Sequence, residues 1–115
     1  MKIGEDEGVR LLGDRFRAAG LDLVDGYAME IAGKTVHLDG YDPGRKIGFE
    51  YVTTEAGDRE ELSVEVVAEL ERRMRLGELY VLLIDEREVS GAAVLERAAD
   101  HFLAVMKAKG RLGGP

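Results

Sequence analysis

Four residues that could bind a divalent metal ion lie close together in the chain: Glu30, His37, Asp39 and Glu50. Carboxylate and imidazole groups are suitable ligands for such an ion, and Mg²⁺ or Mn²⁺ would be the expected cofactor. A metal ion held in this way can activate water for hydrolysis. Alternating charges of this kind are also typical of the solvated face of an antiparallel sheet, so this second interpretation stays open.

The segment 27–52 contains all four residues and predicts three short strands joined by two tight turns. Gly33 and Lys34 separate two alternating runs, and glycine supplies the positive φ that a tight hairpin turn needs. Residues 42–45 have the sequence Asp-Pro-Gly-Arg, which is typical of a second turn. These turn signals predict an antiparallel meander.

The positions of the turns predict the register of the strands. Ala32 is expected opposite Thr35 in the first hairpin, and Tyr41 opposite Lys46 in the second. Directly opposed side chains lie roughly 5 Å apart and diagonal ones about 7 Å apart, which is within reach of a shared ion. In this register Glu30, His37 and Glu50 form a row across the three strands. Asp39 lies diagonal to Glu50.

Side chains alternate between the two faces of a strand, so the register also predicts which residues share a face. The polar face is expected to carry Glu30, His37, Asp39, Lys46 and Glu50. The apolar face is expected to carry Met29, Ile31, Val36, Leu38, Ile47, Phe49 and Tyr51.

The rest of the chain predicts helices and one buried strand. Apolar residues at helical spacing indicate helices over about 5–19, 59–76 and 90–109, each followed by a glycine. Residues 79–84 are apolar at every position, which is typical of a strand buried on both faces. The expected fold is α/β (α+β) in the order α-β-β-β-α-β-α. Its mixed four-stranded sheet combines an antiparallel meander with one parallel crossover strand and is flanked by helices.

Length and composition limit the classes of protein to consider. The chain of 115 residues is expected to be a single domain, 1–115, with a mobile tail over 110–115. The absence of Cys excludes disulfides and thiolate metal sites, and no apolar run reaches membrane-spanning length. We therefore expect a soluble, cytoplasmic protein that does not bind membranes. A net charge of -7 disfavours contact with phosphate backbones because like charges repel.

With Asp39 in the second strand and Glu50 in the third, the predicted order of elements resembles the core of the restriction-endonuclease-like proteins, the PD-(D/E)XK superfamily. The stretch LDGYDPGRKIGFEYV looks like the motif hairpin of that family, in which an Asp is followed, after a short turn, by an acidic residue, one intervening residue and a Lys. The resemblance implies that Asp39 and Glu50 are the catalytic residues and hold a divalent cation, with Glu30 or His37 as a further ligand. Val52 stands where the family has its Lys.

Two functions are compatible with these observations. The first is a non-catalytic protein-binding or regulatory module on a degenerate nuclease-like core, which is the function favoured by the acidic charge and by Val52. Its partner is expected to be a basic protein or a second copy of the chain in a homodimer. The alternative is a metal-dependent nuclease or phosphodiesterase that uses Asp39 and Glu50, and only this function involves nucleic acid. Lys46 shares the polar face but lies some 13 Å from the motif position along an extended strand, so it is a poor substitute for the missing Lys.

Overall fold

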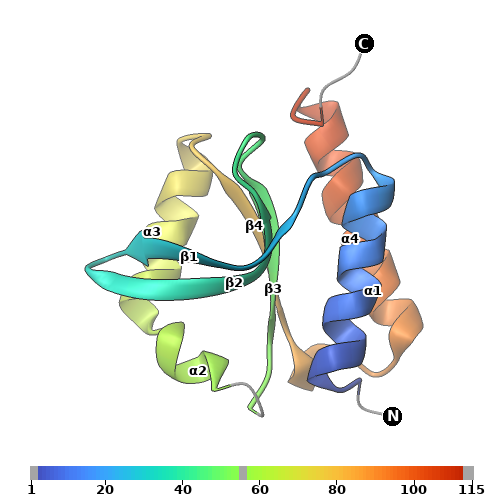
Figure 1. Cartoon of the computed structure of the whole chain (residues 1–115), viewed down its shortest axis with the longest axis horizontal. Coiled ribbons are helices and arrows are strands. Elements are labelled where there is room, and N and C mark those ends of the chain that lie inside the picture. Colours follow the sequence, from blue (N-terminus) through green and yellow to red (C-terminus); the bar gives the residue numbers. More distant parts are fainter. Residues whose placement is uncertain (1–2, 55–56, 113–115) are drawn as a thin grey trace.

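The computed structural model describes residues 3–54 and 57–112, in which helices and strands follow the predicted order (Figure 1). The elements are α1 (Glu5–Ala18), β1 (Val24–Ile31), β2 (Lys34–Asp42), β3 (Ile47–Val52), α2 (Asp58–Glu61), α3 (Val64–Arg75), β4 (Tyr80–Asp85), the 3₁₀ helix η1 (Glu86–Glu88) and α4 (Ala92–Ala108).

The strands form one mixed sheet in the order β1-β2-β3-β4. The pairs β1–β2 and β2–β3 are antiparallel, whereas β3 and β4 run parallel. A helical crossover through α2 and α3 joins the parallel strands, because such a pair cannot be connected by a tight turn. Helices α1 and α4 lie side by side on one side of the sheet, and α3 lies on the other (Figure 1). The predicted fold class is confirmed.

The helix predicted over 59–76 is interrupted. Helix α2 ends at Glu61, and α3 begins after Ser63, whose hydroxyl accepts a hydrogen bond from the N–H of Val66 at 3.3 Å. Serine is a strong helix N-cap because its side chain satisfies an N–H that has no partner within the helix. The capping chemistry of Ser63 therefore starts a new helix inside one continuous apolar pattern.

Both hairpins are shifted by two residues from the predicted register. Ile31 faces Lys34 across the first turn, and Asp42 faces Ile47 across the second. The turn-closing pairs that we predicted from the glycines, one in each hairpin, are therefore wrong.

The shift has a cause in the backbone. Among the described residues, two that are not glycine have a positive φ, Ala32 at 53° and Lys46 at 61°, and one lies in each turn. A residue with a Cβ rarely adopts this conformation, so the positions of the glycines point to the wrong turn residues. Ala32 and Gly33, with a φ of 78°, form a two-residue turn with positive φ at both positions, which matches the twist of paired strands.

Strand β2 bends near its middle. Leu38 and Tyr41 are three residues apart, yet both pack into the same hydrophobic cluster. A regular strand does not allow this, because successive side chains point to opposite faces. Asp39 and Gly26, which has a φ of 59°, are missing from the otherwise continuous pairing of β1 with β2. Figure 1 shows the β1–β2 hairpin turned away from the direction of β3 and β4.

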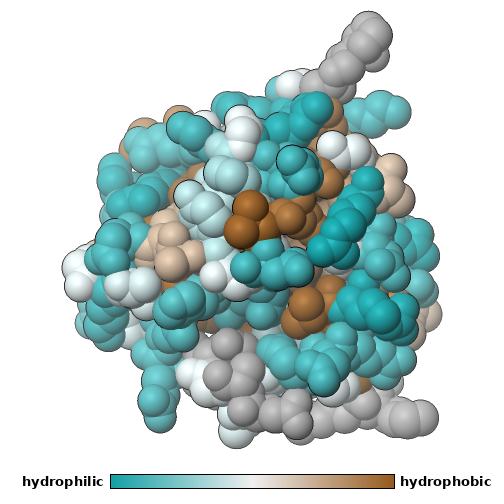
Figure 2. Space-filling model, in the orientation of Figure 1, coloured by the Kyte–Doolittle hydropathy of each residue, from teal (hydrophilic) through white to brown (hydrophobic). Residues whose placement is uncertain are grey.

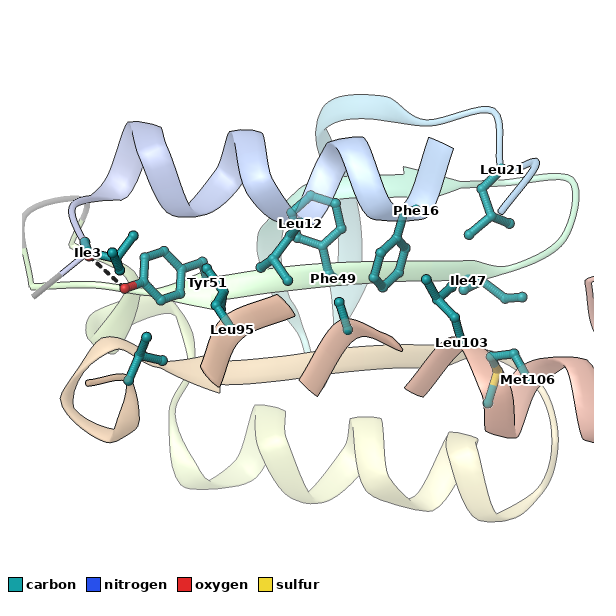
Figure 3. Close-up of a cluster of buried hydrophobic side chains, with 12 residues drawn as sticks. Ile3, Leu12, Phe16, Leu21, Ile47, Phe49, Tyr51, Leu95, Leu103 and Met106 are labelled. Carbon is teal, nitrogen blue, oxygen red and sulfur yellow. Dashed lines mark hydrogen bonds between the residues drawn. The ribbon is translucent and has the colours of Figure 1, made fainter. Parts of the chain in front are cut away.

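The bend divides the apolar residues of the sheet between two cores. One core lies against α1 and α4 and includes Phe16, Phe49 and Tyr51 (Figure 3). The rings of Phe16 and Phe49 are 5.0 Å apart, centroid to centroid. The other core lies against α3 and includes Val36 and Leu38. The prediction of a single apolar face made of Met29, Ile31, Val36, Leu38, Ile47, Phe49 and Tyr51 is therefore wrong.

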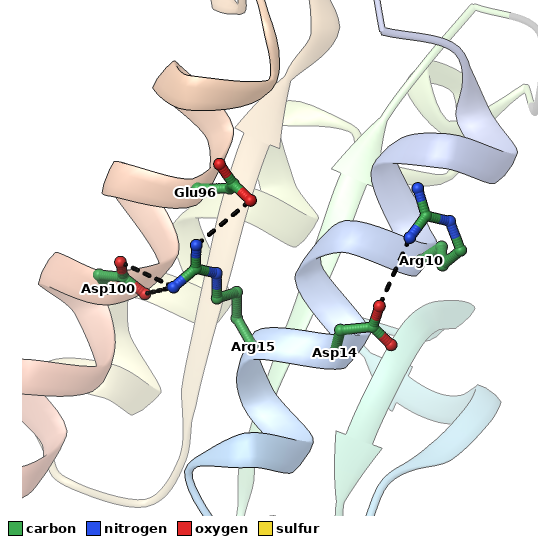
Figure 4. Close-up of polar contacts among 5 residues, drawn as sticks. All are labelled: Arg10, Asp14, Arg15, Glu96 and Asp100. Carbon is green, nitrogen blue, oxygen red and sulfur yellow. Dashed lines mark hydrogen bonds and ion pairs between the residues drawn. The ribbon is translucent and has the colours of Figure 1, made fainter.

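An arginine joins α1 to α4 at the surface. Arg15 forms ion pairs with Glu96 and Asp100, each with an N–O distance of 3.2 Å (Figure 4). These side chains are 34 % to 54 % exposed, so the ion pairs are expected to contribute on the order of 0–1 kcal/mol. Phe16 is fully buried in the same helix and stacks on Phe102 of α4 at 5.7 Å. The aromatic packing therefore holds the two helices together.

We expected the segment 110–115 to be a mobile tail, and Arg111 within it has contacts to the rest of the chain that the structure describes. The guanidinium of Arg111 lies 5.1 Å from the centre of the Tyr80 ring and donates a hydrogen bond to the Gly77 carbonyl at 3.2 Å. Residues 113–115 lie outside the described residues.

The molecular surface is mostly hydrophilic on the face shown in Figure 2, where hydrophobic residues are exposed only in small areas. Among the described residues, the large hydrophobic side chains that are exposed are Val24, Val64 and Leu76. Within 3–54 and 57–112, no helix has the length and apolar character needed to cross a membrane.

Candidate functional site

Asp39 and Glu50 meet between β2 and β3. The Asp39 carboxylate accepts a hydrogen bond from the N–H of Tyr51 at 2.8 Å, and the Glu50 carboxylate accepts one from the N–H of Asp39 at 2.9 Å. Each side chain therefore bonds to the backbone of the opposite strand. The two residues predicted as a catalytic pair are indeed neighbours, and each already binds a backbone amide.

These bonds continue the β2–β3 connection where the regular ladder stops. Paired residues in the ladder are limited to Gly40–Phe49, Tyr41–Gly48 and Asp42–Ile47. Beyond this point β2 bends away, and carboxylate oxygens take the place of backbone carbonyls as acceptors. A buried N–H left without an acceptor would cost about 1–3 kcal/mol. The carboxylates of Asp39 and Glu50 therefore have a structural role.

Two glycines allow the strands to come this close. A Cβ on Gly48 would lie 2.4 Å from the carbonyl oxygen of Gly40, and a Cβ on Gly40 would lie 2.6 Å from the ring of Phe49. Both distances are shorter than real contacts of a Cβ atom. The close approach of β2 and β3 at this point therefore requires glycine at both positions.

The two carboxylates differ in exposure. Glu50 is 0 % exposed, whereas Asp39 is only partly buried and reaches the surface of a hollow. Burying a carboxylate is costly unless hydrogen bonds or charges compensate for the lost water. The bond from the backbone of Asp39 is part of that compensation at Glu50.

Tyr51 lies beside this pair and connects β3 to the start of the described chain. Its hydroxyl donates a hydrogen bond to the carbonyl of Ile3 at 2.6 Å. Burial, followed by the negative charges of Glu86 and Glu5, raises the pKa of the Tyr51 phenol. The hydroxyl therefore keeps its proton for this hydrogen bond over a wide pH range.

Glu30 and His37 lie away from the pair, on the β1–β2 hairpin. Glu30 faces Thr35 and accepts a hydrogen bond from its hydroxyl, and His37 faces Ala28. Both side chains are exposed. Glu61 of α2 accepts a hydrogen bond from the His37 N–H at 2.7 Å and lies 3.4 Å from its Nδ1. The predicted row of ligands across three strands is not formed, because the register is shifted and β2 bends.

Of the four predicted metal ligands, Asp39 and Glu50 are therefore the two that lie next to each other. In residues 3–54 and 57–112, no group of three or more His, Asp or Glu side chains is placed to hold a metal ion. Mg²⁺ is often bound through one or two carboxylates and retains several waters. Binding of Mg²⁺ or Mn²⁺ by Asp39 and Glu50 stays a prediction, and Glu30 and His37 are not adjacent to them.

Asp39 lines a hollow of about 470 Å³ between α1 and the sheet. Helix α1 contributes the carboxylates of Glu5 and Asp6, and Val9 and Phe49 add apolar surface. The two guanidinium groups that line the hollow form ion pairs with further carboxylates, Arg10 with Asp14 and Arg17 with Asp25. We call this space the acidic hollow.

The sequence did not identify Glu5 as part of this region. Acidic residues in the first turn of a helix usually complement the helix dipole, and 5–7 fit that explanation. In the structure Glu5 is partly buried and accepts a hydrogen bond from the Thr53 hydroxyl at 3.3 Å. The two residues are 48 positions apart, so no local pattern reveals their contact.

The position of the motif Lys is apolar. Val52 is 9 % exposed and lines a separate hollow with Leu62 and Leu83. Lys46 lies in the β2–β3 turn, at the other end of β3, and lines a third hollow of about 700 Å³. Other cations there are Arg45, Arg73 and Arg111. This basic hollow and the acidic hollow share none of their described lining residues, so the cluster of Lys46 and these arginines is separate from Asp39.

Comparison of the chain with known proteins gives no information on function, so the function must be inferred from the site. No protein-family model, curated protein or solved structure matches the chain. The resemblance to the PD-(D/E)XK superfamily is therefore neither supported nor excluded by a relative.

Proposed function

We propose that the chain is a non-catalytic protein-binding module built on a degenerate PD-(D/E)XK-like core. The observation that carries this proposal is the pair of hydrogen bonds by which Asp39 and Glu50 each accept a backbone N–H of the opposite strand. In a metal-dependent nuclease, the corresponding carboxylates hold the cation that activates water. Here they stabilise the junction of β2 and β3, and this role accounts for both residues without catalysis.

The surroundings of Val52 support the same function. Its side chain is nearly buried and lies with Leu62 and Leu83 on the apolar side of a hollow that Asp85, Arg87 and Glu88 also line. An aliphatic side chain can neither transfer a proton nor stabilise the charge that develops on a phosphate. The group that would complete a nuclease site is therefore missing from this position.

The partner that fits the acidic hollow is a basic segment of another protein. The net charge of -7 attracts positively charged partners over a long range. In the hollow, the exposed carboxylate of Asp6 lies with the apolar surface of Val9, which is only partly buried. A Lys or Arg side chain can place its aliphatic part on such a surface and its charge beside the carboxylates.

Titration of the protein with a peptide rich in Lys and Arg, followed by NMR, tests this function. We expect amide shifts that concentrate around the acidic hollow and weaken with added salt, because salt screens charge attraction. Asp6→Asn should reduce the affinity, whereas the matched change Glu71→Gln, at an exposed position on α3, should not. Equal effects of the two variants, or shifts spread over the whole surface, would argue against the hollow as the binding site.

A metal-dependent nuclease or phosphodiesterase is the second candidate, because one arrangement favours it. Asp39 and Glu5 line the same hollow, and Glu50 is bonded to the backbone of Asp39. Carboxylates from α1, β2 and β3 thus approach one region, and they are the type of ligand that Mg²⁺ prefers. A titration with Mn²⁺ separates the two functions, because only the nuclease depends on a bound cation.

A further inference from the structure

Strand β4 forms an edge of the sheet. It pairs with β3 on one side, and in the described part of the chain no strand pairs with its other side (Figure 1). The side chains of Leu82, Leu83 and Ile84 are only partly buried, although all are apolar. The edge therefore offers both backbone groups and accessible apolar surface.

The hydrogen bonds to β3 show which backbone groups point outward. The N–H of Tyr80 donates to the carbonyl of Lys46 at 2.9 Å, so the backbone N–H and C=O of Tyr80 are directed toward β3. The backbone groups of successive residues point to alternate sides of a strand. The N–H and C=O of Val81, Leu83 and Asp85 are therefore directed to the open edge. Among the described residues, neither Val81 nor Leu83 forms a hydrogen bond there.

The opposite edge of the sheet is protected and β4 is not. Strand β1 carries the exposed charges of Asp25 and Glu30, and Gly26 has a φ of 59° that breaks its regular course. Charged residues and local distortions are the usual means by which an edge strand avoids pairing with another chain. From residue 80 to 84, β4 has no charge, no proline and no positive φ. Such an edge is available for pairing.

The charges at the two ends of β4 are of opposite sign. Near Tyr80, Lys109 Nζ and the Arg111 guanidinium lie 5.9 and 5.1 Å from the ring centre. Glu78 is at the same end and offsets one of these charges. The other end continues into η1, whose exposed residues are Glu88 and Arg87, and the Arg87 guanidinium pairs with Asp85 at 2.9 Å. One end is therefore net positive and the other net negative.

We propose that β4 pairs in antiparallel orientation with β4 of a second copy of this chain, forming a two-fold symmetric dimer with one continuous sheet. Antiparallel pairing brings the positive end of each strand to the negative end of the other, which a parallel arrangement would not do. The symmetric register centred on the outward-facing Leu83 places Leu83 opposite Leu83 of the second copy. This surface is distinct from the acidic hollow, so the dimer does not depend on the function proposed above.

Apolar surface is available beside the two-fold axis. A hollow of about 350 Å³ adjoins Leu83 and is lined on its apolar side by Val52, Leu62 and Val67. In the proposed register, the Leu83 side chains of both copies lie next to each other on the face of the sheet that carries this hollow. Pairing therefore buries apolar surface in addition to forming backbone hydrogen bonds.

Hydrogen exchange and sedimentation test the dimer together. The amide of Leu82 is bonded within the chain, whereas the amide of Leu83 is protected only if a second strand pairs with the edge. We expect a concentration-dependent dimer in analytical ultracentrifugation. In the dimer, exchange of the Leu83 amide should be as slow as that of Leu82. A monomer at every accessible concentration, or rapid exchange of Leu83 at high concentration, would overturn the proposal.

Variants at the edge provide a second test. Leu83→Lys brings two positive charges together at the two-fold axis and should weaken the dimer about tenfold or more. The matched control Ala28→Lys, at an exposed position of the β1 edge, should leave the dimer intact. If Leu83→Lys does not fold, Lys109→Glu and Glu88→Lys serve instead. Each alone should weaken the dimer, and the double variant should restore it; failure of this restoration contradicts the antiparallel pairing.

Discussion

Asp39 and Glu50 each accept a hydrogen bond from the backbone of the other's strand, Asp39 from the N–H of Tyr51 and Glu50 from the N–H of Asp39. This exchange lies where β2 bends away and the regular β2–β3 pairing ends. A carboxylate side chain is longer than a backbone carbonyl, so it can reach an amide across the wider gap. The pair therefore stabilises a bend that backbone pairing alone does not.

Removal of the Asp39 carboxylate should destabilise the protein. Asp39→Ala leaves the N–H of Tyr51 without this acceptor, and we expect the free energy of unfolding to fall by about 1–3 kcal/mol. Asp39→Asn keeps one side-chain oxygen and should lose less. Urea denaturation followed by circular dichroism measures both changes. Equal stability of wild type and Asp39→Ala would show that this hydrogen bond is not structural.

Glycine at position 48 should be essential for folding. In Gly48→Ala the added methyl would lie 2.4 Å from the backbone oxygen of Gly40, which cannot move without disrupting the sheet. We expect a loss of about 3 kcal/mol or more, or no folded protein. Gly4→Ala is the matched control, because nothing lies within 4 Å of a Cβ at that position. If both variants melt at the same temperature, the close approach of β2 and β3 is incorrect.

Asp42 should make stability depend on pH in the acid range. Burial would raise the pKa of Asp42, but hydrogen bonds from the backbone N–H groups of Asp22, Arg45 and Gly44 outweigh it and hold the pKa below its ordinary value of 3.8. The ionised form therefore stabilises the fold above the pKa of the unfolded chain, and this contribution is lost as the pH falls through the lower folded pKa.

The difference in stability between wild type and Asp42→Asn measures this contribution. It should be largest near neutral pH and should decrease below about pH 4, because protonation then removes the charge in the wild type as well. Urea denaturation at a series of pH values provides the curve. A difference that stays constant from neutral pH down to pH 2 would contradict the role of the ionised Asp42.

Packing, and not the surface ion pairs, should hold α1 against α4. Phe16→Ala empties a fully buried site between the helices and should cost about 3–5 kcal/mol. Arg15→Ala breaks the exposed ion pairs with Glu96 and Asp100 and should cost less than about 1 kcal/mol. Thermal unfolding of the two variants compares these effects directly. If Arg15→Ala lost more stability than Phe16→Ala, the ion pairs and not the packing would hold the two helices together.

The order of elements could be predicted because it depends on local patterns. Apolar residues at helical spacing and the continuous run of 79–84 indicate the helices and β4 without knowledge of their partners. The register of the hairpins could not be predicted in this way. It depends on positive φ values at Ala32 and Lys46. Alanine and lysine rarely adopt a positive φ, so their presence in the sequence does not predict it.

The candidate site was predicted in part. Asp39 and Glu50 come together as expected, because they are the next residues beyond the Gly40–Phe49 pair, where β2 and β3 still lie close. Glu30 and His37 were placed incorrectly, since the direct cross-strand neighbours change with an error of two residues in register and β2 also bends. The contribution of Glu5 depends on the packing of α1 against the sheet, which no local spacing reveals.

Calorimetric titration of the wild type and of Asp39→Asn with Mn²⁺ and Mg²⁺ tests most directly whether the two carboxylates are structural. If they are committed to the backbone of β2 and β3, neither protein binds the ions at a defined site, and Asp39→Asn differs from the wild type only in stability. Binding of one ion to the wild type, lost in a folded Asp39→Asn variant, would contradict this account and identify a metal-dependent site.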